Sequence, residues 1–190
     1  VQLAAPLTQI IDSCIGNTWT AVSPTTLSTN TTRKKGSNCQ QINIASTTGT
    51  GKIAYKTLAS TLDLSSFQNI SLFFGGSDLI KFITSKFRVC LCSDSLGDSI
   101  VDSFYLDDIV STYGLSVQTY KKGAPLSSTI NSVAIYREGS AVSFTIRLQA
   151  IIACNSLALD SLIGKSDALN TAWYPVKYID GTTVELDSAT

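Results

Sequence analysis

The side chains that most often carry out catalysis are only partly represented in this chain of 190 residues. There is no His, which excludes Ser-His-Asp and Cys-His catalysis and removes the commonest ligand of zinc and iron. A glycosidase would need two carboxylates about 5 to 10 Å apart across a cleft. Asp107 and Asp108 are adjacent, so in a strand they would point to opposite faces. We therefore predict no catalytic residues and no enzymatic activity.

Metal binding is the second chemistry to consider. Asp94, Asp98 and Asp102 recur around Gly97, but their spacing differs from the Asp-x-Asp-x-Asp-Gly pattern of a calcium loop. We interpret these residues as surface carboxylates. We predict no metal site and no cofactor.

The chain has five cysteines, an odd number, so at least one must be free within a single chain. Cys90 and Cys92 alternate with Val89 and Leu91, which places both thiols on one face of a strand. Without His or a second Cys pair, buried reduced thiols are favoured over a metal site. Reduced thiols favour assembly in a cytoplasm over secretion.

Aromatic side chains could bind sugars, because exposed rings of a β-sandwich stack on sugar faces. The candidate ligand-binding residues are Tyr105, Tyr113, Tyr120, Tyr136, Trp173 and Tyr178. Packing in a core or an interface is the competing explanation for each of them, since most fall on predicted strands.

Charge argues against two classes of partner. Fourteen basic residues balance fourteen acidic ones, so no long-range field attracts nucleic acid or an anionic membrane. The basic clusters Arg33-Lys34-Lys35 and Lys121-Lys122 lie among loop residues, and we interpret them as solvated charges. No apolar run is long enough to span a bilayer. We expect no nucleic-acid and no membrane partner.

The elements that must position these residues are predicted to be strands. Ser and Thr make up roughly a quarter of the chain, and short alternating segments are separated by turns, which favours an all-β antiparallel sandwich. Ser23–Ser37 is predicted to be a long loop, and one or two helical turns are expected near Phe104–Val110. The predicted strands are Cys39–Ala45, Lys52–Leu58, Asn69–Phe74, Lys86–Cys92, Leu115–Tyr120, Ile130–Tyr136 and Ser140–Cys154.

Alternation also predicts which side chains share a face. Ile53 and Tyr55 should lie on one face of their strand, and Ile70, Leu72 and Phe74 should point inward from theirs. In the longest run, one face should carry Val142, Phe144, Ile146, Leu148, Ala150 and Ile152.

The composition changes after Ile152, and we predict two parts. Residues 1–157 form the sandwich, and residues 158–190 form a connector and a hairpin that leads to, or docks on, another part. The hairpin joins Trp173–Tyr178 to Thr182–Leu186, and Pro175 argues that its first strand is an edge. Trp173, Tyr174, Pro175 and Val176 are the candidate assembly residues.

Several segments, taken in order, resemble the jelly-roll modules of tailed-phage virion proteins, which look like galactose-binding or carbohydrate-binding-module sandwiches. The resemblance runs from about Trp19 to Leu186. The segments that carry it are Trp19–Val22, Asn38–Gln40, Ile42–Ala45, Gly51–Leu58, Ser60–Phe74, Phe87–Asp94, Ser132–Tyr136, Ser161–Ser166 and Trp173–Leu186.

This resemblance implies a non-enzymatic jelly-roll component of a phage virion, used as a head decoration, neck or tail appendage. Its partners would be other virion proteins or copies of itself, and it would be assembled in the host cytoplasm. The alternative is a glycan-binding module, for host-surface recognition or as an accessory domain of a polysaccharide-degrading enzyme. Related sandwiches hold a structural calcium with an Asp where this chain has Gln149, and an amide is a poorer calcium ligand than a carboxylate.

Overall fold

The computed structural model describes most of the chain, in several stretches. These are residues 8–32, 37–77, 84–106, 116–140 and 143–155, and within them only the backbone is described for 116–119 and 121. The backbone alone is also described for two further stretches, 176–178 and 184–186.

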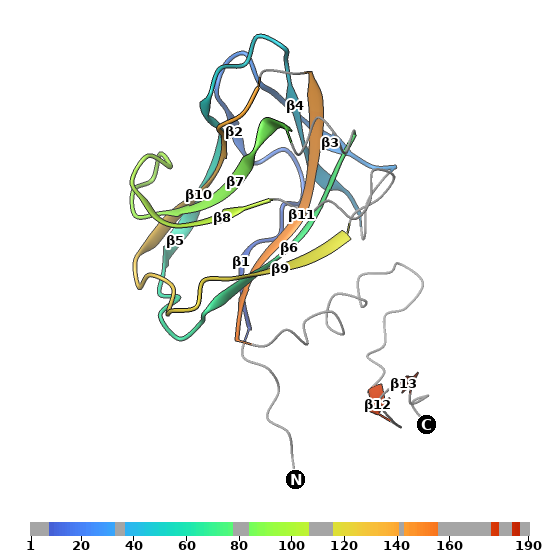
Figure 1. The fold of residues 1–190 in the computed structure, drawn as a ribbon, viewed down its shortest axis with the longest axis vertical. Helices are drawn as coiled ribbons and strands as arrows, with labels where there is room; N and C mark the ends of the chain where they lie inside the picture. The colour runs from blue at the N-terminus through green and yellow to red at the C-terminus, as the bar shows by residue number, and fades with distance from the viewer. Residues whose placement is uncertain are drawn as a thin grey trace.

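Two antiparallel sheets form the body of the protein (Figure 1). Sheet A has the order β3 (Thr26–Asn30), β4 (Cys39–Ile44), β11 (Phe144–Cys154), β6 (Asn69–Gly76) and β9 (Ser116–Lys121), and β1 (Thr8–Asp12) also pairs with β11. Sheet B has the order β2 (Thr20–Ala21), β5 (Gly51–Leu62), β10 (Ile130–Arg137), β7 (Phe87–Cys92) and β8 (Ile100–Tyr105).

Successive strands mostly alternate between the two sheets. From β4 to β7 each strand lies in the sheet opposite to the one before it, and the same is true from β8 to β11. This connectivity confirms the predicted all-β antiparallel jelly-roll sandwich. The predicted hairpin is also present, because β12 (Val176–Tyr178) pairs antiparallel with β13 (Val184–Leu186).

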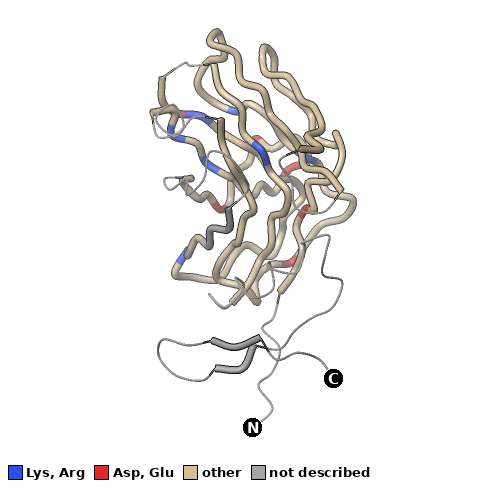
Figure 2. Tube along the Cα trace, turned by 90° about the vertical axis from the view of Figure 1, so that its right-hand side faces the viewer, with Lys and Arg blue, Asp and Glu red and all other residues tan. Residues whose placement is uncertain are grey.

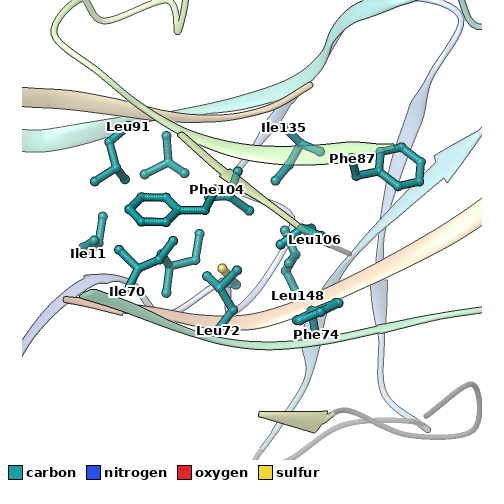
Figure 3. Close-up of a cluster of buried hydrophobic side chains, with 14 of the residues drawn as sticks. Ile11, Ile70, Leu72, Phe74, Phe87, Leu91, Phe104, Leu106, Ile135 and Leu148 are labelled. Carbon is teal, nitrogen blue, oxygen red and sulfur yellow. The ribbon is translucent and has the colours of Figure 1, made fainter. Parts of the chain in front are cut away.

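The core is a single apolar layer between the sheets (Figure 3). Ile70, Leu72 and Phe74 enter it from β6, as alternation predicted, while Leu91 and Phe104 enter it from sheet B. Each buried side chain of this size contributes roughly 1.5 to 3 kcal/mol. Sequence alternation therefore identified the core face of β6.

Two bulges change the faces that alternation predicts. Between β5 and β10 the register shifts beside Ile53, so Ile53 and Ala54 both face the core and Tyr55 packs on the outward side. The prediction that Ile53 and Tyr55 share a face was wrong for this reason. A second bulge in β11 turns Ile151 and Ala153 inward, in place of Ala150 and Ile152.

Three strands of five or six residues lie where the sequence predicted none. Thr8–Asp12 is a strand within a segment expected to be irregular, and Thr26–Asn30 is a strand within the expected long loop. Ile100–Tyr105 is a strand where helical turns were expected to begin near Phe104. All three pair on one side with a neighbouring strand, so tertiary pairing selects the strand conformation that their own patterns indicate only weakly.

A charged pair ties the two sheets together at one edge. Asp102 on β8 has a fully buried side chain, which forms an ion pair with Lys122 and accepts a hydrogen bond of 2.8 Å from the backbone N–H of Ser127. Interpreting Asp102 as a surface carboxylate and Lys122 as a solvated charge was therefore wrong. Removing one partner of such a pair would leave a buried charge without compensation.

All five cysteines are free and buried, which confirms the expectation of reduced thiols. Burial raises the pKa of Cys90 to about 12 and the pKa values of Cys92 and Cys154 to about 11. These thiols are protonated at neutral pH, and thiolate is the reactive form.

Thiol labelling tests this arrangement. We expect a maleimide or a chromogenic disulfide reagent to label none of the five cysteines in the native protein at pH 7, and all five after denaturation. The number of labels per chain is read by mass spectrometry. Rapid labelling of Cys90 or Cys92 without denaturant would contradict their burial in the native sandwich.

Candidate functional site

The outward face of sheet B carries a row of alternating cationic and aromatic side chains. Arg88 on β7 lies opposite Tyr136 on β10 and Tyr105 on β8, and Tyr136 lies opposite Lys52 on β5. We call these four residues the Tyr-Arg row. The guanidinium carbon of Arg88 lies 5.6 Å from the ring centre of Tyr105 and 5.7 Å from that of Tyr136, within the range of cation-π attraction.

The core determines that this row faces outward. Phe87, Val89 and Leu91 of β7 fill the apolar layer, so Arg88 between them must point away from it. Val133 and Ile135 fix β10 in the same way and turn Tyr136 outward. The position of the row is therefore a consequence of core packing.

Each cation of the row is paired with a carboxylate. Nη2 of Arg88 lies 2.7 Å from Oε1 of Glu138, which follows β10, and the Tyr105 hydroxyl donates a hydrogen bond of 2.9 Å to Oε2 of the same residue. Nζ of Lys52 donates to Oδ1 of Asp98 at 2.5 Å and to the carbonyl of Leu96 at 2.8 Å. The row thus presents donors and acceptors side by side without a net charge.

The two tyrosines differ in exposure. Tyr105 is 43% exposed, so part of its ring is open to a ligand. Tyr136 is partly buried, and its hydroxyl donates a hydrogen bond of 2.7 Å to the carbonyl of Gly97. Burial, together with the nearby thiols and carboxylates, raises the pKa of Tyr136 to about 12, so its hydroxyl stays protonated at neutral pH.

The loop Ser93–Ser99 folds back over sheet B beside the row. Partial burial acts to raise the pKa of Asp94, but the N–H groups of Ser99, Asp98 and Leu96 outweigh it and lower that pKa to about 2. The carboxylate of Asp94 therefore holds the loop in its turn conformation.

Gly97 allows the loop to lie this close to the sheet. It has a φ of +79°, and a Cβ built on it would lie 3.0 Å from the Cβ of Ala134 and 3.1 Å from that of Tyr55. Beneath the loop, Cys90, Cys92 and Ala134 form a small buried cluster against which Tyr55 and Tyr136 pack. The loop and this cluster together support the Tyr136 end of the row.

The outward face of sheet A is different, because amides and hydroxyls bond there to one another. Gln41 accepts from Asn30 at 2.9 Å and donates to Asn43 at 2.9 Å and to Ser28 at 3.2 Å, while Thr145 donates to Asn43 at 3.4 Å. These contacts fill much of the hydrogen-bonding capacity of the network. A polar face of this kind is typical of the solvated side of an antiparallel sheet.

The structure brings two of the predicted ligand-binding residues together, Tyr105 and Tyr136. Tyr120 lies on sheet A and packs against the core, with its ring centre 6.4 Å from that of Phe74. The remaining predicted residues cannot be placed in the same way: Tyr113, Trp173, Tyr174 and Pro175 lie outside the described residues, and only the backbone is described for Val176 and Tyr178.

The described residues provide no carboxylate set suited to calcium. Asp94 holds its own loop, Asp98 pairs with Lys52, and Asp102 pairs with Lys122, so the three act separately. Gln149 is largely buried and lies at the bulge of β11. Within the described part of the chain, no three His, Cys, Asp or Glu side chains gather where they could hold a metal ion.

Sequence reasoning missed Arg88, Glu138 and Lys52 as candidate site residues. The alternation of Lys86–Cys92 indicates that Arg88 faces outward, but it does not indicate that β8 and β10 flank β7. Glu138 lies 50 residues beyond Arg88, so their ion pair depends on tertiary pairing that no local pattern encodes.

Charged residues are spread over the molecule and not gathered into one patch of a single sign along the described trace (Figure 2). Figure 2 shows basic and acidic residues distributed along the described trace, consistent with the formal net charge of zero. No helix in the described stretches is long and apolar enough to cross a membrane.

No protein-family model and no curated protein matches this chain. Three solved structures show distant similarity. The K1 adhesin domain of Lys-gingipain from Porphyromonas gingivalis W83 is 13% identical with a TM-score of 0.47, and the match covers 80% of this chain and 99% of that domain. The xylan-binding module CBM15 is 13% identical with a TM-score of 0.46, and the match covers 80% of this chain and 98% of the module. The enzymatically active domain of tailspike protein 4 of bacteriophage CBA120 is 14% identical with a TM-score of 0.46, and the match covers 76% of this chain and 21% of that domain. These similarities are too distant to assign an activity.

Substitution of Gly97 tests the close contact between the loop and sheet B. We expect Gly97→Ala to lower the free energy of unfolding more than Gly123→Ala does, by a further 1 to 3 kcal/mol or so, because the added methyl group overpacks against Ala134 and Tyr55. Gly123 is the matched control, since its φ of +78° carries the same backbone cost with no atom within 4 Å of the added Cβ. Equal losses in urea unfolding would show that the loop does not pack on the sheet.

The carboxylate of Asp94 should make a pH-dependent contribution to stability. Its pKa is lowered on folding from an ordinary value near 3.9 to about 2, so the contribution is present above about pH 4 and is lost as the pH falls towards 2. We expect Asp94→Asn to be less stable than the wild type at pH 6, and the difference to shrink at pH 2.5. Urea unfolding at both pH values measures it, and a difference that stays constant would contradict the lowered pKa.

Proposed function

We propose that this chain is a non-catalytic module that binds glycans through the outward face of sheet B. The observation that supports this most strongly is the cluster of Tyr105, Arg88 and Glu138, in which a part-exposed aromatic ring adjoins a paired donor and acceptor. An aromatic ring stacks on the C–H face of a sugar, and the guanidinium and carboxylate serve its hydroxyl groups.

The cluster of Tyr105, Arg88 and Glu138 suits ligand binding better than acid-base catalysis. The chain has no His to act as a base, and Glu138 already accepts hydrogen bonds from Arg88 and Tyr105. Both carboxylate oxygens of Glu138 are thus engaged in holding Arg88 and Tyr105 in position. Binding by pre-positioned side chains is the simpler use of this arrangement.

A structural role on a phage particle is the second candidate. Leu96, Ile100 and Val101 are large apolar side chains that are 55%, 37% and 41% exposed, and they cluster in sequence around the start of β8. Apolar side chains of this kind suit contacts with neighbouring virion proteins or with further copies of the chain. The two roles are compatible, since a virion module can recognise a surface glycan of its host.

Electron microscopy of intact virions tests the structural role. We expect density for this sandwich on the particle surface, and absence of the chain from intact virions would overturn the structural role.

Substitution of Tyr105 tests glycan binding. We expect the wild type to bind members of a bacterial-polysaccharide array, and Tyr105→Ala to weaken the strongest interaction about fivefold, because it loses a stacking contact worth roughly 1 kcal/mol. Titration calorimetry measures the change. Tyr105→Phe is the matched control, since it keeps the ring and loses only the hydrogen bond to Glu138. An unchanged affinity in Tyr105→Ala, or no binding across the array, would contradict the proposal.

A further inference from the structure

The Tyr-Arg row also has a direction and a length, and these define what kind of glycan fits it. The following inference rests on the proposed function and makes it more specific. We propose that the site takes an extended, uncharged glycan chain laid across the strands of sheet B, with Tyr136 and Tyr105 contacting two sugars separated by one intervening sugar.

The spacing of the strands supports the direction of the chain. Tyr136 and Tyr105 both lie directly opposite Arg88, one on each side, so they are two strands apart on the same face. Neighbouring strands lie about 4.8 Å apart, which separates the two tyrosines by about 10 Å. That separation is too long for two rings to contact a single sugar, and it suits two alternate sugars of an extended chain.

The residues between the tyrosines would contact the intervening sugar. Arg88 offers N–H groups and Glu138 offers carboxylate oxygens, and their closest atoms are 2.7 Å apart. Two hydroxyls on neighbouring ring carbons can accept from the guanidinium and donate to the carboxylate at once. The side chain of Arg88 is only 20% exposed, so it is already held in place before a ligand arrives.

The pairing of charges supports an uncharged ligand. Arg88 is paired with Glu138, and Lys52 is paired with Asp98, so neither cation is free to attract an acidic sugar. A uronic acid would bring its carboxylate close to those of Glu138 and Asp98, where like charges repel. Sugars that carry only hydroxyl groups meet no such cost.

Oligosaccharides of defined length test this inference on the wild-type chain. The probes are xylo-, cello- and manno-oligosaccharides of one to six sugars, with oligogalacturonides of the same lengths as the acidic comparison. We expect at least one neutral series to show no measurable binding of the single sugar, a steep rise in affinity up to three sugars, and a plateau beyond. Oligogalacturonides should bind more weakly than neutral chains of equal length. Titration calorimetry provides the affinities.

Two variants assign the contacts. Tyr136→Ala should bind the trisaccharide no better than the wild type binds the disaccharide. Glu138→Gln should weaken trisaccharide binding about tenfold or more, because a charge-assisted hydrogen bond is lost. Asp63→Asn is the matched control for loss of a carboxylate, since Asp63 is exposed in the turn after β5, at the end of that strand remote from Glu138.

The outcomes separate this inference from the proposed function. Binding that does not depend on length, or that favours oligogalacturonides, overturns the inference while leaving glycan binding intact. Binding of no glycan of any length overturns both. The length series needs no substitution, so it decides the question even if Tyr136→Ala fails to fold.

Discussion

The apolar layer shared by the two sheets determines the rest of this structure. Side chains alternate along a strand, so the inward residues fix which residues point outward. On β7 the inward positions of Phe87 and Val89 turn Arg88 to the solvent side, and on β10 Ile135 does the same for Tyr136. The Tyr-Arg row is therefore held in register by hydrophobic burial on the opposite face of the same strands, and a site on rigid strands keeps its geometry better than one on loops.

This dependence explains which parts of the fold the sequence predicts. Period-two alternation is a local property, so it correctly identified the strand at Asn69–Phe74 and the inward face made by Ile70, Leu72 and Phe74. It failed where one extra residue interrupts the period. At Ile53 a bulge admits two consecutive residues to the core, and the position of such a bulge is set by the partner strand β10.

The candidate site was predictable in its residue types and not in its assembly. The sequence predicts Tyr105 and Tyr136 as candidate ligand-binding aromatics, whereas Arg88 and Glu138 acquire a role only when β7, β8 and β10 pair. Tyr120 has the same chemistry, but its position opposite Ile70 places it on the inward side of sheet A. Which tyrosine meets solvent is thus decided by register.

The place of β11 in sheet A bears on how the chain folds as it is synthesised. This strand is the last of the sandwich to be made, yet it joins β4, β6 and β1, which do not pair with one another. Sheet A cannot be completed before Cys154 has left the ribosome. Until then β1 and β4 lack their partner β11, and their apolar side chains remain exposed to solvent. Pairings between such distant segments form slowly, and exposed strand edges favour aggregation in the interval. Dependence on chaperones during synthesis is the consequence we expect of this topology.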